Sequence, residues 1–77
     1  MKNDDLAYIR PRAMGKGELA LLYAPEQTQA VAVKRLVKWM RLHPLLMDEI
    51  NATGYRTHQK QLSARQVEII FKYLGNP

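Results

Sequence analysis

The amino-acid sequence predicts a mainly α-helical domain, a small bundle of about four helices with a short basic loop or hairpin before the last one. The first indication is a helical period, with apolar residues recurring three or four positions apart. The second is the spacing of the proline and glycine residues, which interrupt helices and divide the chain into segments of helical length. The third is size, because 77 residues without cysteine suffice for one compact core and exclude disulfides.

The expected domain organisation is simple. A single domain spans the chain, and its parts are a disordered start, an arm or edge strand, and a helical core: residues 1–5, 6–14 and 18–75. No apolar run approaches the roughly 20 residues needed to cross a bilayer, and the first residues lack the apolar segment of a signal peptide. The sequence therefore favours a cytoplasmic protein.

The first predicted helix covers residues 18–23. Glu18 places a negative charge in its first turn, which suits the helix dipole. Pro25 ends it, because the residue before a proline avoids the helical region. Gly15 and Gly17 predict a turn before this helix.

The second predicted helix, residues 29–42, has an apolar and a basic face. Thr28 is a suitable N-cap for it. At 3.6 residues per turn, the side expected to face the core is formed by Ala30, Val33, Val37 and Met40, with Leu36 at its edge. The adjacent stripe is cationic: Lys34, Lys38 and Arg41, extended by Arg35. Such a helix can pack on a core and present positive charge to a partner.

Two further helices are expected. Pro44 suits the first turn of a third helix, which the Thr-Gly pair at 53–54 ends. The polar and basic stretch 55–62 is typical of a hairpin or an extended loop. Ser63 and Gln66 have the spacing of a capping box, which opens the last helix.

Positive charge is concentrated in the second half of the chain. The net charge is +5, and residues 34–65 carry seven cations against two anions, so the rest of the chain is neutral overall. This distribution favours a polyanionic partner, whereas the alternative is a solubilising surface.

The order of elements resembles a winged helix-turn-helix, in which the second helix enters the major groove and a loop contacts the flanking backbone. The resemblance is to DNA-binding domains of the MerR and phage-excisionase type, and it depends on residues 16–20, 36–39, 54–56 and 63–70. It implies that the second helix and the loop bind DNA. The chain departs from that pattern in its longer connector around Pro25 and in the extra helix at 44–52.

A closer resemblance covers nearly the whole chain. Trp39 and four stretches, at residues 18–25, 53–55, 65–67 and 73–77, are similar to a small bacterial family known only as a domain of unknown function. This resemblance implies membership of that family and supplies no activity.

Six cations are the candidate contacts to nucleic acid: Lys34, Arg35, Lys38, Arg41, Arg56 and Lys60. Lysines suit phosphate contacts, whereas Arg35 and Gln29 suit contacts to base edges. Double-stranded DNA is the expected partner. RNA ranks lower, because the sequence offers no exposed aromatic pair at sheet spacing to stack bases. The alternative for these cations is a merely solvated surface.

The third helix offers a different contact. Leu45, Leu46 and Met47 are consecutive, so one helix face cannot bury all three. They form either a wide core contact or the surface for a homodimer or protein partner. A non-enzymatic interaction module is therefore the second functional hypothesis.

No catalytic, metal or cofactor site is expected. His43 and His58 are the only imidazoles, and neither has a carboxylate within one helical turn. No serine or cysteine nucleophile is paired with a base, and no small-molecule substrate is indicated. The sequence therefore predicts that the protein is not an enzyme.

Overall fold

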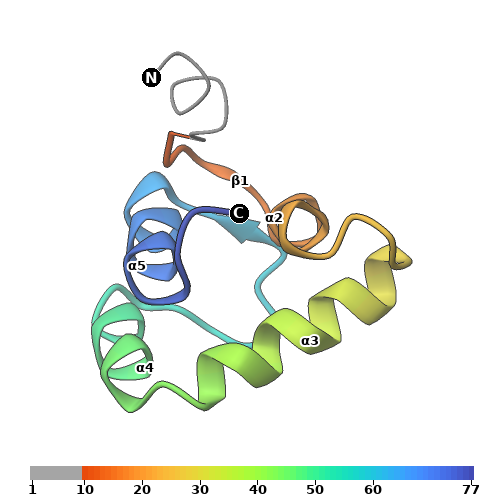
Figure 1. Ribbon diagram of the computed structural model, residues 1–77. Coiled ribbons are helices and arrows are strands. Elements are labelled where there is room, and N and C mark those ends of the chain that lie inside the picture. The colour runs from red at the N-terminus through yellow and green to blue at the C-terminus, as the bar shows by residue number, and fades with distance from the viewer. Residues whose placement is uncertain (1–9) are drawn as a thin grey trace, which may run out of the picture.

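A computed structural model describes residues 10–77, which form four helices and one two-stranded sheet (Figure 1). The elements are, in order, β1 (Met14–Gly15), α2 (Lys16–Tyr23), α3 (Gln29–Arg41), α4 (Pro44–Asn51), β2 (Gln61–Leu62) and α5 (Ala64–Leu74). The prediction of a small, mainly helical domain with about four helices is confirmed. The expected disordered start and the first part of the expected arm, residues 1–9, lie outside the described residues. None of the helices described is long and apolar enough to cross a bilayer.

The predicted helix caps are present. The Thr28 hydroxyl oxygen accepts a hydrogen bond from the Val31 N–H at 3.3 Å and caps α3. Ser63 and Gln66 form the reciprocal capping box of α5. Pro44 occupies the first turn of α4, where its missing N–H costs no hydrogen bond. Local side-chain chemistry therefore determines where these three helices begin.

The prediction of a turn at Gly15 and Gly17 is wrong. Helix α2 begins at Lys16, directly after β1, with Gly15 as its N-cap and Gly17 in its first turn. A Cβ atom at position 17 would lie 1.8 Å from Nε2 of Gln29, so any side chain there would displace the Gln29 side chain. Gly17 therefore permits the beginning of α3 to pack closely against the beginning of α2.

The stretch before α5 is an extended loop and not a hairpin. Its last two residues form β2, which pairs antiparallel with β1, so that Met14 is opposite Leu62 and Gly15 is opposite Gln61. The Lys16 N–H continues this pairing by donating to the Lys60 carbonyl at 2.7 Å. Because β1 leads directly into α2, the sheet fixes the end of the loop beside that helix.

The buried face of α3 is rotated from the predicted one. Ala32, Leu36 and Met40 are fully buried, whereas Val33 is only partly buried and Ala30 is exposed. Apolar residues occur at most positions between 30 and 37, so the periodicity admits neighbouring stripes equally well. Packing against α2, α4 and α5 selects the stripe spaced by four residues and centred on Leu36.

Three aromatic rings pack together where α2, α3 and α5 meet. The Tyr23 ring packs edge-on against Trp39 and Phe71, with ring centroids 6.3 and 6.2 Å away. The Tyr23 hydroxyl donates to the Gly75 carbonyl, which holds the end of the chain against α2 (Figure 1). Burial raises the pKa of Tyr23 to about 12.

Candidate nucleic-acid interface

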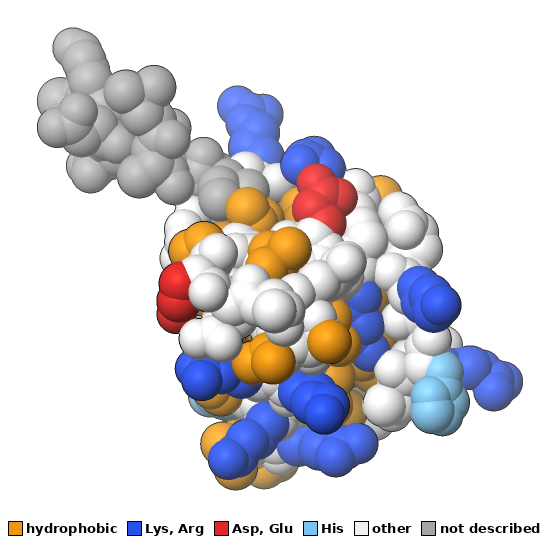
Figure 2. Space-filling view, turned by 90° about the vertical axis from the view of Figure 1, so that its right-hand side faces the viewer, with side chains coloured by type: hydrophobic (Ala, Val, Ile, Leu, Met, Phe, Trp, Pro, Cys, Tyr) orange, Lys and Arg blue, Asp and Glu red, His pale blue; other side chains and the backbone are white. Residues whose placement is uncertain are grey.

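Helix α3 presents its cations to solvent along the side opposite its buried stripe. At 100° per residue, Lys34, Lys38 and Arg41 lie within one narrow sector of the helix circumference. Arg35 lies beside this sector. All four side chains are exposed. Blue side chains gather over the lower part of the molecule, where α3 lies (Figure 2). The predicted basic stripe is therefore present on the folded surface.

The loop between α4 and β2 adds two exposed cations, Arg56 and Lys60. The Arg56 N–H donates to Oε1 of Gln59 at 3.1 Å, which closes a turn within the loop. Further Lys and Arg side chains are visible at the right-hand edge of the view in Figure 2, away from the cluster over α3. The helix and the loop are thus two separate sources of positive charge.

A cleft of about 830 Å³ separates α3 from this loop. One wall is formed by Gln29, Ala30, Val33 and Lys34 of α3, the other by residues 57–61, and the start of α2 completes the lining. Among the six candidate contacts, Lys34 and Lys60 line the cleft. Arg35, Lys38, Arg41 and Arg56 do not.

Lys16 lies in the lining of the cleft and is only 5% exposed. Its ammonium group donates to the Thr57 carbonyl at 2.7 Å and lies 4.8 Å from the centre of the Tyr55 ring. Burial lowers the pKa of Lys16, and the nearby guanidinium of Arg41 lowers it further. A single residue of α2 therefore connects to both ends of the 57–60 segment, through its side chain and its backbone.

Gln66 holds the other side of the loop. Its buried side-chain oxygen accepts hydrogen bonds from Gln59 Nε2 at 2.6 Å and from the Ser63 N–H at 3.0 Å. Its amide nitrogen donates to Thr53 Oγ1 at 2.9 Å. The helix-capping residue of α5 thus also connects the loop to the end of α4.

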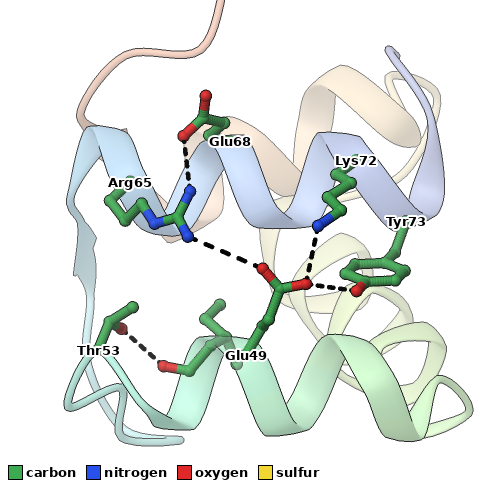
Figure 3. A network of polar contacts seen from close by, with 7 residues as sticks. Glu49, Thr53, Arg65, Glu68, Lys72 and Tyr73 are labelled. Carbon is green, nitrogen blue, oxygen red and sulfur yellow. Dashed lines mark hydrogen bonds and ion pairs between the residues drawn. The ribbon is translucent and has the colours of Figure 1, made fainter.

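The cations of α5 differ from those of α3, because they are paired with acidic residues (Figure 3). The Glu49 carboxylate of α4 forms ion pairs with Lys72 at 3.0 Å and with Arg65 at 3.8 Å. It also accepts a hydrogen bond from the Tyr73 hydroxyl. Arg65 also pairs with Glu68 at 3.0 Å. The hydrogen bonds from Tyr73 and Lys72 hold the pKa of Glu49 below its ordinary value, and the same contacts raise the pKa of Lys72 and of Tyr73. The charge on this side of the molecule is largely compensated.

None of the six candidate contacts forms an ion pair within residues 10–77. In that part of the chain, the acidic side chains that form ion pairs are Glu18, Glu49 and Glu68, and their partners are Arg12, Arg65 and Lys72. Within the described residues, the positive charge of α3 and the loop is therefore not compensated by ion pairs.

The three consecutive apolar residues of α4 are divided by the fold. Leu46 is fully buried, and Met47 is partly buried and packs against the core, so both take part in the core contact. Leu45 is 67% exposed, and the neighbouring Leu42 is 68% exposed. A protein contact at this place would thus depend on Leu42 and Leu45, of which the sequence indicated only the second.

Lys16 is the residue of the site that the sequence pattern did not single out. No signal in the sequence marked it, because the helix was expected to begin at Glu18 and Lys16 to lie in the turn before it. Gln29, expected to read base edges, lies with its side chain against Gly17 in the wall of the cleft. His43 and His58 are both exposed, and no group of three or more metal-ligating side chains occurs in the described region.

A comparison with protein families finds one match over most of the chain. The family model described as domain of unknown function DUF4248 matches residues 10–77, which is the whole of the described structure. No curated protein and no solved structure matches the sequence.

Proposed function

This chain belongs to the DUF4248 family, and from the charges on its surface we propose that it is a small non-enzymatic protein that binds double-stranded DNA. In this proposal α3 lies against the major groove, and the loop at 55–62 contacts the flanking backbone, as in a winged helix-turn-helix. Lys34, Lys38 and Arg41 contact phosphates. Arg35, on the shoulder of the stripe, is available to a guanine edge.

The observation that carries the proposal is the separation of paired from unpaired cations. The cations of α5 are paired with carboxylates, whereas those of α3 and the loop have no acidic partner within residues 10–77. Uncompensated cations on adjacent elements attract a polyanion, and on binding they displace the counterions condensed on its phosphates. A surface kept only for solubility would not require this separation, because paired charges also keep a protein hydrated.

Two features of the fold support the winged arrangement. Helices α2 and α3 pack extensively on each other, and the basic loop lies beside α3 across the cleft. The strand that precedes α5 is paired with the strand that precedes α2, which holds the loop near the helix pair. The connector at 24–28 and helix α4 are the departures from the arrangement, and α4 lies away from the cleft.

The test is a salt titration of binding to a short random-sequence DNA duplex. If all six cations replace counterions, the logarithm of the association constant falls against the logarithm of salt concentration with a slope of about −5. A duplex that does not bind even at low ionic strength would contradict the proposal. The same titration is made with a single-stranded RNA of matched length. If the RNA binds more tightly than the duplex at the same salt concentration, the basic surface is an RNA-binding surface and the proposal is wrong.

Exposed leucines favour a second candidate function, a protein contact. Leu42 lies between α3 and α4, Leu45 lies in the first turn of α4, and both are more than half exposed. An apolar pair of this kind suits a homodimer or a protein partner. Sedimentation equilibrium of the wild type and of Leu45→Gln tests it: a monomer over the whole concentration range in both would contradict self-association.

A further inference from the structure

The cleft between α3 and the loop has the charge of an anion site. Three lysines line it, Lys16, Lys34 and Lys60, against one carboxylate, Glu18. Glu18 is paired with Arg12 at 3.2 Å, so the net field in the cleft is positive. Concave walls of low polarisability focus such a field.

The cleft is also held open before any ligand arrives. Lys16 connects to the Thr57 carbonyl by its side chain and to the Lys60 carbonyl by its backbone, both at 2.7 Å. On the far side, Gln59 donates to the Gln61 carbonyl at 2.7 Å and to Gln66. The loop wall therefore does not have to be ordered on binding, which removes one cost of association.

The side chains that line the cleft suit phosphate. A lysine ammonium is a compact charge with three donors, and it binds phosphate without demanding one geometry. Lys34 and Lys60 project from opposite walls, one from α3 and one from the loop. The Gln29 amide in the same lining can donate to a sugar or phosphate oxygen.

We propose that this cleft is a phosphate-binding site that takes the sugar–phosphate backbone of one DNA strand, between Lys34 and Lys60, and that Lys16 sets its width. The inference rests on the proposed function and adds to it the path of the strand. It divides the six cations, because Lys34 and Lys60 contact the strand inside the cleft, whereas the other four contact DNA outside it. Lys16 is a positioning residue, since its ammonium is occupied by Thr57 and Tyr55.

Glycine amide signals in a nitrogen–proton correlation spectrum provide the direct test. Gly15 and Gly17 line the cleft, whereas Gly75 does not and serves as the internal control. Adding the DNA duplex is expected to shift the signals of Gly15 and Gly17 and to leave that of Gly75 in place. Adenosine monophosphate is added in a parallel titration, as a small molecule that carries a single terminal phosphate.

Charge variants complete the test. Lys34→Gln and Lys60→Gln should each reduce the salt slope by about one, because each removes one phosphate contact. Arg10→Gln is the control: it removes one exposed charge outside the cleft, α3 and the loop, so it should preserve both the salt slope and the shifts of Gly15 and Gly17. All three side chains are exposed, so circular dichroism should report an unchanged fold.

The outcomes separate this inference from the proposed function. If the duplex binds with a steep salt dependence but Gly15 and Gly17 do not shift, the strand lies elsewhere and only the cleft assignment fails. If the mononucleotide shifts these signals and the duplex does not, the cleft serves a small phosphate ligand and the assignment also fails. If the duplex does not bind at low salt, the proposed function itself fails.

Discussion

The ammonium group of Lys16 donates a hydrogen bond to the carbonyl of Thr57 at 2.7 Å, across 41 residues of sequence. This contact joins the first turn of α2 to the basic loop, and the Tyr55 ring lies against the same ammonium group. The hydrogen bond between Lys16 and Thr57 thereby holds the loop beside α3, where the loop forms the second wall of the cleft. The spatial relation between the two basic elements therefore depends on a residue that belongs to neither.

The first prediction concerns Lys16→Met, which keeps an unbranched side chain but removes the terminal ammonium group and its charge. Burial lowers the pKa of Lys16 and so disfavours its charged form, which means that removing the charge should offset part of the cost of losing the hydrogen bond to Thr57. The loop should nevertheless loosen, because Thr57 loses its donor. Amide hydrogen exchange at residues 55–61 should accelerate while exchange in α5 stays slow.

The sign of the pH effect follows from the direction of that shift. Lys16 in the folded protein binds its proton less tightly than in the unfolded chain, so its charge lowers stability at neutral pH. This penalty should disappear as the pH rises through the folded pKa towards the ordinary value of 10.5. In Lys16→Met this gain of stability with pH should be absent, and its persistence would assign it to another group.

The second prediction concerns Lys38→Glu. The side chain is exposed on the outer face of α3, so the variant should fold normally and bind DNA more weakly, with the salt slope reduced by about one or more. Arg10→Glu is its control, because it is exposed and changes the net charge equally, from +5 to +3, outside α3 and the loop. Equal losses in the two variants would mean that net charge, and not position, governs binding.

The third prediction tests the buried face of α3. Leu36→Ala removes a fully buried side chain and should lower the free energy of unfolding by about 2–5 kcal/mol. Ala30→Ser, at a position expected from sequence to be in the core but exposed in the structure, should change it by less than about 0.5 kcal/mol. Chemical denaturation of both variants measures the difference. If both variants lower the free energy of unfolding by a similar amount, Ala30 belongs to the core and the observed buried face is contradicted.

The fourth prediction concerns the pH dependence that Glu49 confers. Its folded pKa lies below the ordinary value of 4.5, so its contribution to stability is complete above that pH and is lost as the pH falls through the folded pKa. Glu49→Gln removes the carboxylate that Lys72 and Tyr73 contact. The thermal midpoint of this variant should fall less on acidification than that of the wild type. Parallel acid profiles would show that other carboxylates dominate.

Local chemistry explains why much of the fold could be predicted from sequence. Thr28 and Ser63 cap their helices by bonds to residues three positions away, and Pro44 acts at its own position. Such signals depend on neighbours in the chain and on little else. The helices, their order and the basic stripe of α3 therefore follow from the amino-acid sequence alone.

Contacts between distant segments explain what could not be predicted. The periodicity of α3 admitted several buried stripes, and packing against its neighbours selected the one around Leu36. Leu45, Leu46 and Met47 are equivalent in sequence, yet only the docking of α4 on α5 determines which is covered. The hairpin alternative failed because β2 found its partner in β1, far away in the chain.

The sequence by itself determined four helical segments, their caps and a cluster of positive charge, because each is a property of residues within a few positions of one another. Only the tertiary structure decided that Lys34 and Lys60 line the same cleft and that Lys16 holds its wall. A cleft is a relation between elements, and it forms when the burial of Leu36, Leu46 and Leu62 in one core fixes those elements relative to one another.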